Sequence, residues 1–140
     1  MQSVTANLLT ATIQAQFDQK ASPTFCWLPD NEYICPSLAQ VEALLAHTKF
    51  EDFKYSGEFP DCDDFADFLR AYVKQQRHRS GDRGMTWAFF EAHGRFGGDG
   101  PHALNGVLTA DRGVVKIEPQ TDELVIGGFA PSDVCWMVRV

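Results

Sequence analysis

A repeating pattern of apolar side chains in residues 62–77 constrains the fold more than any other feature of the sequence. The apolar positions recur at i, i+3, i+4, i+7 and i+8, and they are Phe65, Phe68, Leu69, Tyr72 and Val73. This spacing places them on one face of a helix. Pro60 limits how far the helix can extend backwards, and the turn-forming residues 80–84 indicate its end. The pattern predicts a long amphipathic helix that must bury one face.

Two shorter helical segments precede this helix, and strand-like segments follow it. Residues 4–18 and 37–47 show helical spacing, and Ser37 can cap the second segment. Short apolar stretches then alternate with turns, at residues 85–93, 102–109, 114–118, 124–129 and 133–140. This order predicts an α+β fold in which an N-terminal helical layer, about residues 1–80, packs on a C-terminal antiparallel sheet, about residues 85–140. A chain of 140 residues suffices for one core, so we expect residues 1–140 to form a single domain.

Composition and charge argue against several classes of partner. The formal net charge of -7 disfavours nucleic acid, and no apolar run approaches the roughly 18 residues that a membrane span needs. The first residues lack the basic start of a signal peptide. We therefore expect a cytoplasmic protein that could leave the cell only by lysis or non-classical export. The four cysteines form no C-x-x-C pair and are expected to be free thiols.

Cys62 stands at the predicted start of the long helix, between Asp61 and Asp63. A helix N-terminus lowers the pKa of a thiol, whereas neighbouring carboxylates raise it. Nucleophilic cysteine chemistry needs a nearby histidine and a third polar group that orients it. His102 opens one predicted strand and Glu118 closes the next, and a hairpin would place the two side by side. Cys62, His102 and Glu118 are therefore candidates for a catalytic triad.

Three short motifs carry a resemblance to a known family. DCDDFA (61–66), HALN (102–105) and IEPQT (117–121) together resemble the papain-like cysteine-protease domain of mushroom agglutinins of the fairy-ring mushroom type. The resemblance covers about residues 55–125 and suggests a stand-alone relative without the sugar-binding β-trefoil. It implies that Cys62 is the nucleophile, His102 the base and acid, and Glu118 the orienting carboxylate. The implied function is a papain-like cysteine hydrolase that cleaves amide bonds of a peptide or protein substrate through a thioester.

The resemblance also implies activation by calcium. A cation near Cys62 would offset the adjacent carboxylates, and calcium favours oxygen ligands. The candidate ligands are Asp63, Asp64, Asn105, Gln120 and Asp122. The candidates for the second hydrogen-bond donor of an oxyanion hole are Tyr55 and Gln120. Trp27, Trp87 and Trp136 are expected in the core, with Trp87 also a candidate for lining a substrate groove.

Alternative functions stay open at this point. The same triad would serve a peptidoglycan amidase or endopeptidase, or an enzyme that transfers the acyl group to an amine. A different class of function is a non-enzymatic calcium-binding or interaction module built on the same fold.

Overall fold

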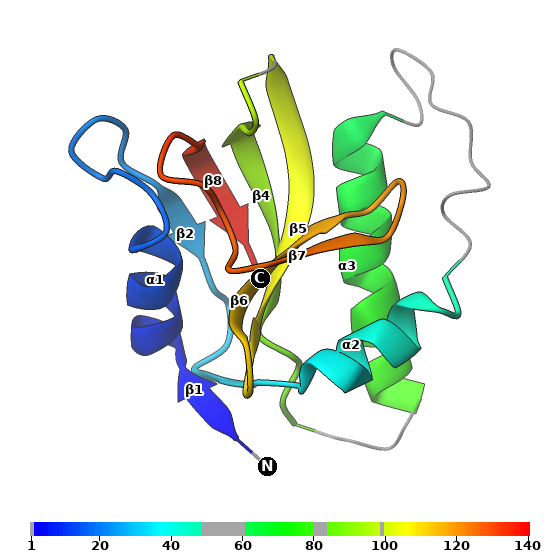
Figure 1. The fold of residues 1–140 in the computed structure, drawn as a ribbon. Helices are drawn as coiled ribbons and strands as arrows, with labels where there is room; N and C mark the ends of the chain where they lie inside the picture. The colour runs from blue at the N-terminus through cyan, green and yellow to red at the C-terminus, as the bar shows by residue number, and fades with distance from the viewer. Residues whose placement is uncertain (1, 49–60, 80–83, 99) are drawn as a thin grey trace.

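The computed structural model describes residues 2–48, 61–79, 84–98 and 100–140. Its elements, in chain order, are β1 (Ser3–Thr5), α1 (Ala6–Gln14), β2 (Phe25–Trp27), β3 (Glu32–Ile34), α2 (Leu38–Leu45), α3 (Cys62–Arg79), β4 (Phe89–Arg95), β5 (Pro101–Thr109), β6 (Gly113–Glu118), β7 (Glu123–Ile126) and β8 (Val134–Arg139). Six strands form one sheet in the order β2-β8-β4-β5-β6-β7, and β1 pairs with β3 in a separate small sheet (Figure 1). No helix in the described ranges has the length and apolar character needed to cross a membrane.

The architecture corrects the expected helical layer on a C-terminal antiparallel sheet. The main sheet is mixed, because β2 comes from the N-terminal part of the chain and pairs in parallel with β8. The helices also lie on both faces of this sheet, with α1 on one side and α2 and α3 on the other (Figure 1). Strands of three residues, such as β1, β2 and β3, are too short to show the alternation by which strands are recognised.

Two apolar clusters hold the helices against the sheet. On one face, Leu9 and Ile13 of α1 pack with Ala92, Leu104 and Val138 of the sheet. On the other face, the helical residues are Val41, Leu45, Leu69 and Val73, and the strand residues are Phe89, Val107, Val115 and Ile117. Because successive side chains of a strand point to opposite faces of the sheet, the sheet contributes residues to both apolar clusters.

The helix α3 begins and ends where the sequence predicts. Asp63 and Asp64 occupy its first turn, and residues 77–79 place basic side chains in its last turn, so both ends complement the helix dipole. The side-chain nitrogen Nδ2 of Asn105, which is fully buried, donates to the Ala66 carbonyl oxygen at 2.9 Å. This bond fixes the first turns of α3 over strand β5.

The helix α2 also begins as predicted. Ser37 Oγ accepts a hydrogen bond from the backbone N–H of Gln40, and Gln40 Oε1 accepts one from the backbone N–H of Ser37. This capping box satisfies two backbone donors that a helix start leaves without partners.

A buried charge cluster joins α3 to strands β4 and β8. The Glu91 side chain is only 3% exposed, and its Oε1 lies 2.7 Å from Arg139 Nε, while its Oε2 lies 3.6 Å from Arg70 Nε. Arg139 also forms a 2.7 Å ion pair with Asp67 of α3. Burial alone would raise the pKa of the Glu91 carboxyl, but His93, Arg139 and Arg70 outweigh it and hold this pKa below its ordinary value.

Candidate functional site

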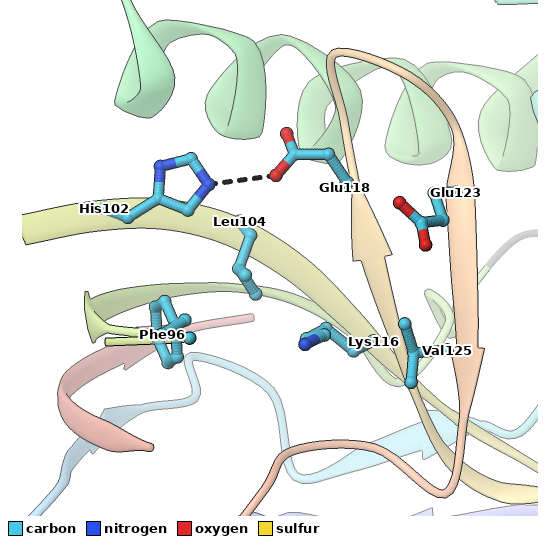
Figure 2. A pocket seen from close by; sticks show the side chains of 8 residues that line it. Phe96, His102, Leu104, Lys116, Glu118, Glu123 and Val125 are labelled. Carbon is cyan, nitrogen blue, oxygen red and sulfur yellow. Dashed lines mark hydrogen bonds and ion pairs between the residues drawn. The ribbon is translucent and has the colours of Figure 1, made fainter. Parts of the chain in front are cut away.

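The ends of β5 and β6 bring His102 and Glu118 into contact. His102 Nε2 lies 2.9 Å from Glu118 Oε2 (Figure 2). Both side chains are between a quarter and a third exposed, so the pair is open to a ligand. Glu118 Oε1 also accepts a hydrogen bond from the backbone N–H of Gln120 at 3.2 Å. The turn after β6 thus holds the carboxylate, which in turn fixes the orientation of the imidazole.

A cavity of about 250 Å³ opens beside this pair. Its lining residues are Phe96, Gly97, His102, Leu104, Lys116, Glu118, Glu123 and Val125. His102 and Glu118 lie on one side of the cavity, while Phe96, Lys116 and Val125 lie on the other (Figure 2). The cavity therefore combines charged groups of both signs with an apolar wall, which is typical of sites for small polar ligands.

The Cys62 thiol lies at the start of α3 and is partly buried. Burial raises its pKa, and the charges of Asp61 and Asp63 raise it further, while backbone hydrogen bonds at Ala103 and Asp63 lower it; the net pKa is raised. The opposing effects expected at this helix start are thus both present, and those that raise the pKa of the thiol outweigh those that lower it.

The Cys62 thiol and the His102–Glu118 pair both lie near the start of strand β5. The thiol faces the backbone of Ala103, which directly follows His102 in the chain. Among the described residues, the hydrogen bonds include none between Cys62 Sγ and the His102 ring. The structure therefore places the three candidate residues around one strand end, and their catalytic roles stay predictions.

The candidate metal ligands fall into two groups. Asp61, Asp63 and Asp64 each offer a carboxylate oxygen, and these oxygens lie within 4.8 Å of one another. Asn105 instead donates to backbone carbonyls of Ala66 and Phe90. Asp122 accepts from Thr48 Oγ1 at 3.1 Å. Within the described part of the chain, the candidate ligands that are gathered as a set are therefore the aspartates around Cys62.

Two further candidates remain. Tyr55 falls outside the described residues. Trp87 is 6% exposed and lies under the guanidinium of Arg77, at a cavity distinct from the one beside His102. Sequence reasoning missed Lys116 and Glu123 in the His102 cavity. Lys116 could have been found, because it precedes Glu118 by two residues and side chains at that spacing share a face of a strand.

Comparisons with known proteins identify the fold. No family model and no curated protein matches the sequence. A solved structure described as a complex of PSL1a with E64 is 20% identical, covers 99% of this chain and 50% of its own, and has a TM-score of 0.81. A crystal structure of Polyporus squamosus lectin, bound to the human-type influenza-binding epitope Neu5Acα2-6Galβ1-4GlcNAc, is 19% identical, covers 99% of this chain and 49% of its own, and has a TM-score of 0.75. This chain thus shares its fold with about half of each longer chain.

These findings contradict the function expected from the three motifs. One of the similar structures carries the name of a lectin, neither title names a papain-like protease domain, and no family model matches. The expected papain-like fold, the cysteine hydrolase and its peptide or protein substrate are corrected accordingly. The motifs misled because a thiol at a helix start and a histidine at a strand end are chemically suggestive on any fold.

Proposed function

We propose that this chain is a non-enzymatic interaction module that binds carbohydrate. The observation that carries the proposal is the likeness over 99% of the chain to Polyporus squamosus lectin, whose structure contains a sialylated trisaccharide. The chain corresponds to 49% of that lectin, so the proposal is tested on this chain by itself.

The test is a calorimetric titration of the chain with Neu5Acα2-6Galβ1-4GlcNAc, with maltose as the unrelated control sugar. We expect saturable binding of the sialylated trisaccharide, no response to maltose, and recovery of the trisaccharide unchanged after long incubation. Equal responses to the two sugars, or none to either, would contradict the proposal.

A second candidate site is centred on Cys62, His102 and Glu118. It is supported by the 2.9 Å contact between His102 and Glu118, by the cavity beside them, and by the description of a similar structure as a complex with E64. We propose that a small polar ligand enters this cavity and comes within reach of the Cys62 thiol. Of the residues suggested from sequence, Gln120 adjoins the site through its bond to Glu118.

Alkylation measures whether the Cys62 thiol is reachable. Iodoacetamide forms a bond from the sulfur of the ionised thiol to carbon and releases iodide, and peptide mapping then locates the label. We expect Cys62 to be labelled in the folded protein, E64 to protect it, and Cys62→Ser to lose the label. If Cys62 is labelled to the same extent with and without E64, the proposal that a ligand binds within reach of this thiol is wrong.

We further propose that calcium binds to the cluster of Asp61, Asp63 and Asp64. The donors fit a hard cation, because they are carboxylate oxygens within 4.8 Å of one another, and Asp61 Oδ1 is buried with no hydrogen-bond partner among the described residues. A bound ion would supply positive charge beside the thiol. Calorimetry with calcium should give one site that Asp63→Asn weakens, whereas Asp18→Asn leaves it unchanged; no binding to the unmodified protein would refute the proposal.

A reducing compartment, such as the cytoplasm, is proposed as the place of action. It is supported by the four cysteines, all of which are free, since disulfides are rare under reducing conditions. A fractionation experiment that finds the protein only outside cells would overturn this assignment.

A further inference from the structure

A cavity of about 560 Å³ lies between α2 and α3, on the sheet face that these helices cover. We call it the helix cavity. Its lining residues include Ala43 and Leu44 of α2, Tyr72 and Gln76 of α3, and Trp87 just before β4. It shares no described residue with the cavity at the ends of β5 and β6. Its volume lies in the range of sites for small organic molecules, and neither the carbohydrate proposal nor the thiol proposal uses it.

Trp87 is a fixed part of this lining. The backbone N–H of Ile34 donates to the Thr86 carbonyl oxygen at 2.9 Å, and the N–H of Ala88 donates to the Ile34 carbonyl oxygen at 2.7 Å. These two bonds hold the backbone on either side of Trp87. The tryptophan is 6% exposed and packs in the apolar cluster between the helices and the sheet.

Arg77 lies over the Trp87 ring and also lines the helix cavity. The guanidinium carbon is 5.7 Å from the centre of the ring, within the range of a cation–π contact. Such a contact uses the face of the guanidinium, whereas the several N–H donors of the group lie in its plane and can serve more than one partner. The contact therefore orients a charge whose edge is suited to bind a carboxylate by two parallel hydrogen bonds.

The charges around the helix cavity favour an anion. No lining residue in the described part of the chain is acidic, although the whole chain has a formal net charge of -7. Arg77 also lines a neighbouring cavity, whose other charged or titratable residues are Lys74, His78 and Asp30. Positive charge therefore prevails at this end of α3, and it would attract an anionic ligand.

The other lining residues offer apolar surface from two helices. Leu44 packs at the border of the apolar cluster, and the Tyr72 ring faces the cavity from α3. Tyr72 Oη lies 3.5 Å from the His47 carbonyl oxygen, so the end of α2 and the middle of α3 are close together there. A flat apolar group between the two helices would contact both.

We infer that the helix cavity binds a small aromatic carboxylate. The carboxylate would accept hydrogen bonds from the Arg77 guanidinium, and the aromatic ring would pack against Leu44 and Tyr72. This binding activity goes beyond the proposed carbohydrate-binding function and does not depend on it.

The test is calorimetry with naphthalene-2-carboxylate and with its uncharged analogue, naphthalene-2-carboxamide. We expect saturable binding of the carboxylate to the unmodified chain and binding of the amide that is about tenfold weaker. Arg77→Gln removes the charge and should weaken the carboxylate about tenfold while leaving the amide unchanged. Arg79→Gln, which removes a charge from the same last turn of α3, is the control and should change neither.

A second pair of variants tests the position of the site. Ala43→Leu places a larger side chain at the cavity and should weaken both ligands about tenfold or more. Ala39→Leu makes the same change at an exposed position one turn earlier in α2 and should change neither.

Each other outcome overturns a stated part of the inference. No carboxylate binding to the unmodified chain refutes the inference as a whole, whatever the result of the carbohydrate titration. Carboxylate binding that Ala43→Leu leaves unchanged refutes the site. Equal losses from Arg77→Gln and Arg79→Gln refute the specific ion pair, because they indicate attraction by overall charge. Circular dichroism verifies the fold of each variant, and an unchanged affinity of Arg77→Gln for the amide verifies that its cavity is intact.

Discussion

Removal of the Glu91 charge tests the account of how α3 is held on the sheet. The substitution Glu91→Gln keeps the shape of a side chain that is 3% exposed and removes its charge. Arg70, whose side chain is 14% exposed, would then keep only Asp67, at 3.3 Å, as its ion-pair partner among the described residues. Breaking a buried ion pair from one side costs about 3–5 kcal/mol.

The expected loss lies below that range. Arg139 is 32% exposed and retains its 2.7 Å contact with Asp67, so solvent and Asp67 compensate part of the cost. We expect Glu91→Gln to lower the free energy of unfolding by about 2–3 kcal/mol at pH 7. Urea denaturation followed by circular dichroism measures this change, and Glu42→Gln on the exposed face of α2 is the matched control, expected within about 0.5 kcal/mol of the unmodified protein.

The stability loss caused by Glu91→Gln should also depend on pH, and the direction of this dependence follows from the pKa of Glu91. The pKa of Glu91 is lowered in the folded state, so its contribution is complete above the unfolded pKa of about 4.3 and is lost as pH falls through the folded value. The difference between the variant and the unmodified protein should therefore shrink below about pH 4. A loss under about 1 kcal/mol at pH 7, or a difference that stays constant down to pH 3, would refute the argument.

Three further predictions concern the scaffold and the thiols. Gly106→Ala would place Cβ in steric conflict with the Phe90 ring, which is fully buried, and should cost about 1–3 kcal/mol in urea denaturation. Gly100→Ala is its control, because a Cβ there would meet no atom of the described residues beyond its chain neighbours, and equal stabilities would contradict the packing. Ser37→Ala removes the capping box and should lower the free energy of unfolding by about 1 kcal/mol in the same assay. Ser37→Asp, which keeps a capping oxygen, should retain most of the stability of the unmodified protein. Burial raises the pKa of Cys26 to about 11 and that of Cys135 to about 12, so iodoacetamide at pH 8 should label them only after unfolding; fast labelling in the folded protein would disprove their burial.

Local patterns in the sequence predicted the local structure well. The helix α3 follows from its apolar spacing, because periodicity reports directly which face is buried. The contact between His102 and Glu118 follows from a short connection between two strands. The capping of α2 follows from Ser37. In each case the determining residues lie within about 20 positions of one another.

The misses share a different physical cause. The pairing of β2 with β8 joins segments about 110 residues apart, and no local pattern encodes such a neighbour. Trp27 and Trp136 were expected in the core because aromatic residues favour burial, yet they are 52% and 40% exposed at the sheet edge. The function inferred from DCDDFA, HALN and IEPQT is wrong, because the inference passed from a few residue types to a whole protein family. The single domain and the roles of Cys62, His102 and Glu118 stay predictions.

The parallel pairing of β2 with β8 also sets the order in which the molecule can assemble as it is synthesised. Thr24 Oγ1 donates to the Cys135 carbonyl oxygen across 111 positions of sequence, so this edge waits for β8 to emerge from the ribosome. Strands β4 to β7 pair with near neighbours in the chain and can form earlier, since contacts between sequence neighbours form faster than distant ones. Until β8 enters between β4 and β2, both of those strands lack a partner there and need protection from aggregation. The exposed rings of Phe25, Trp27 and Trp136 lie on β2 and β8, so a nascent chain assembles this surface only after β8 has emerged.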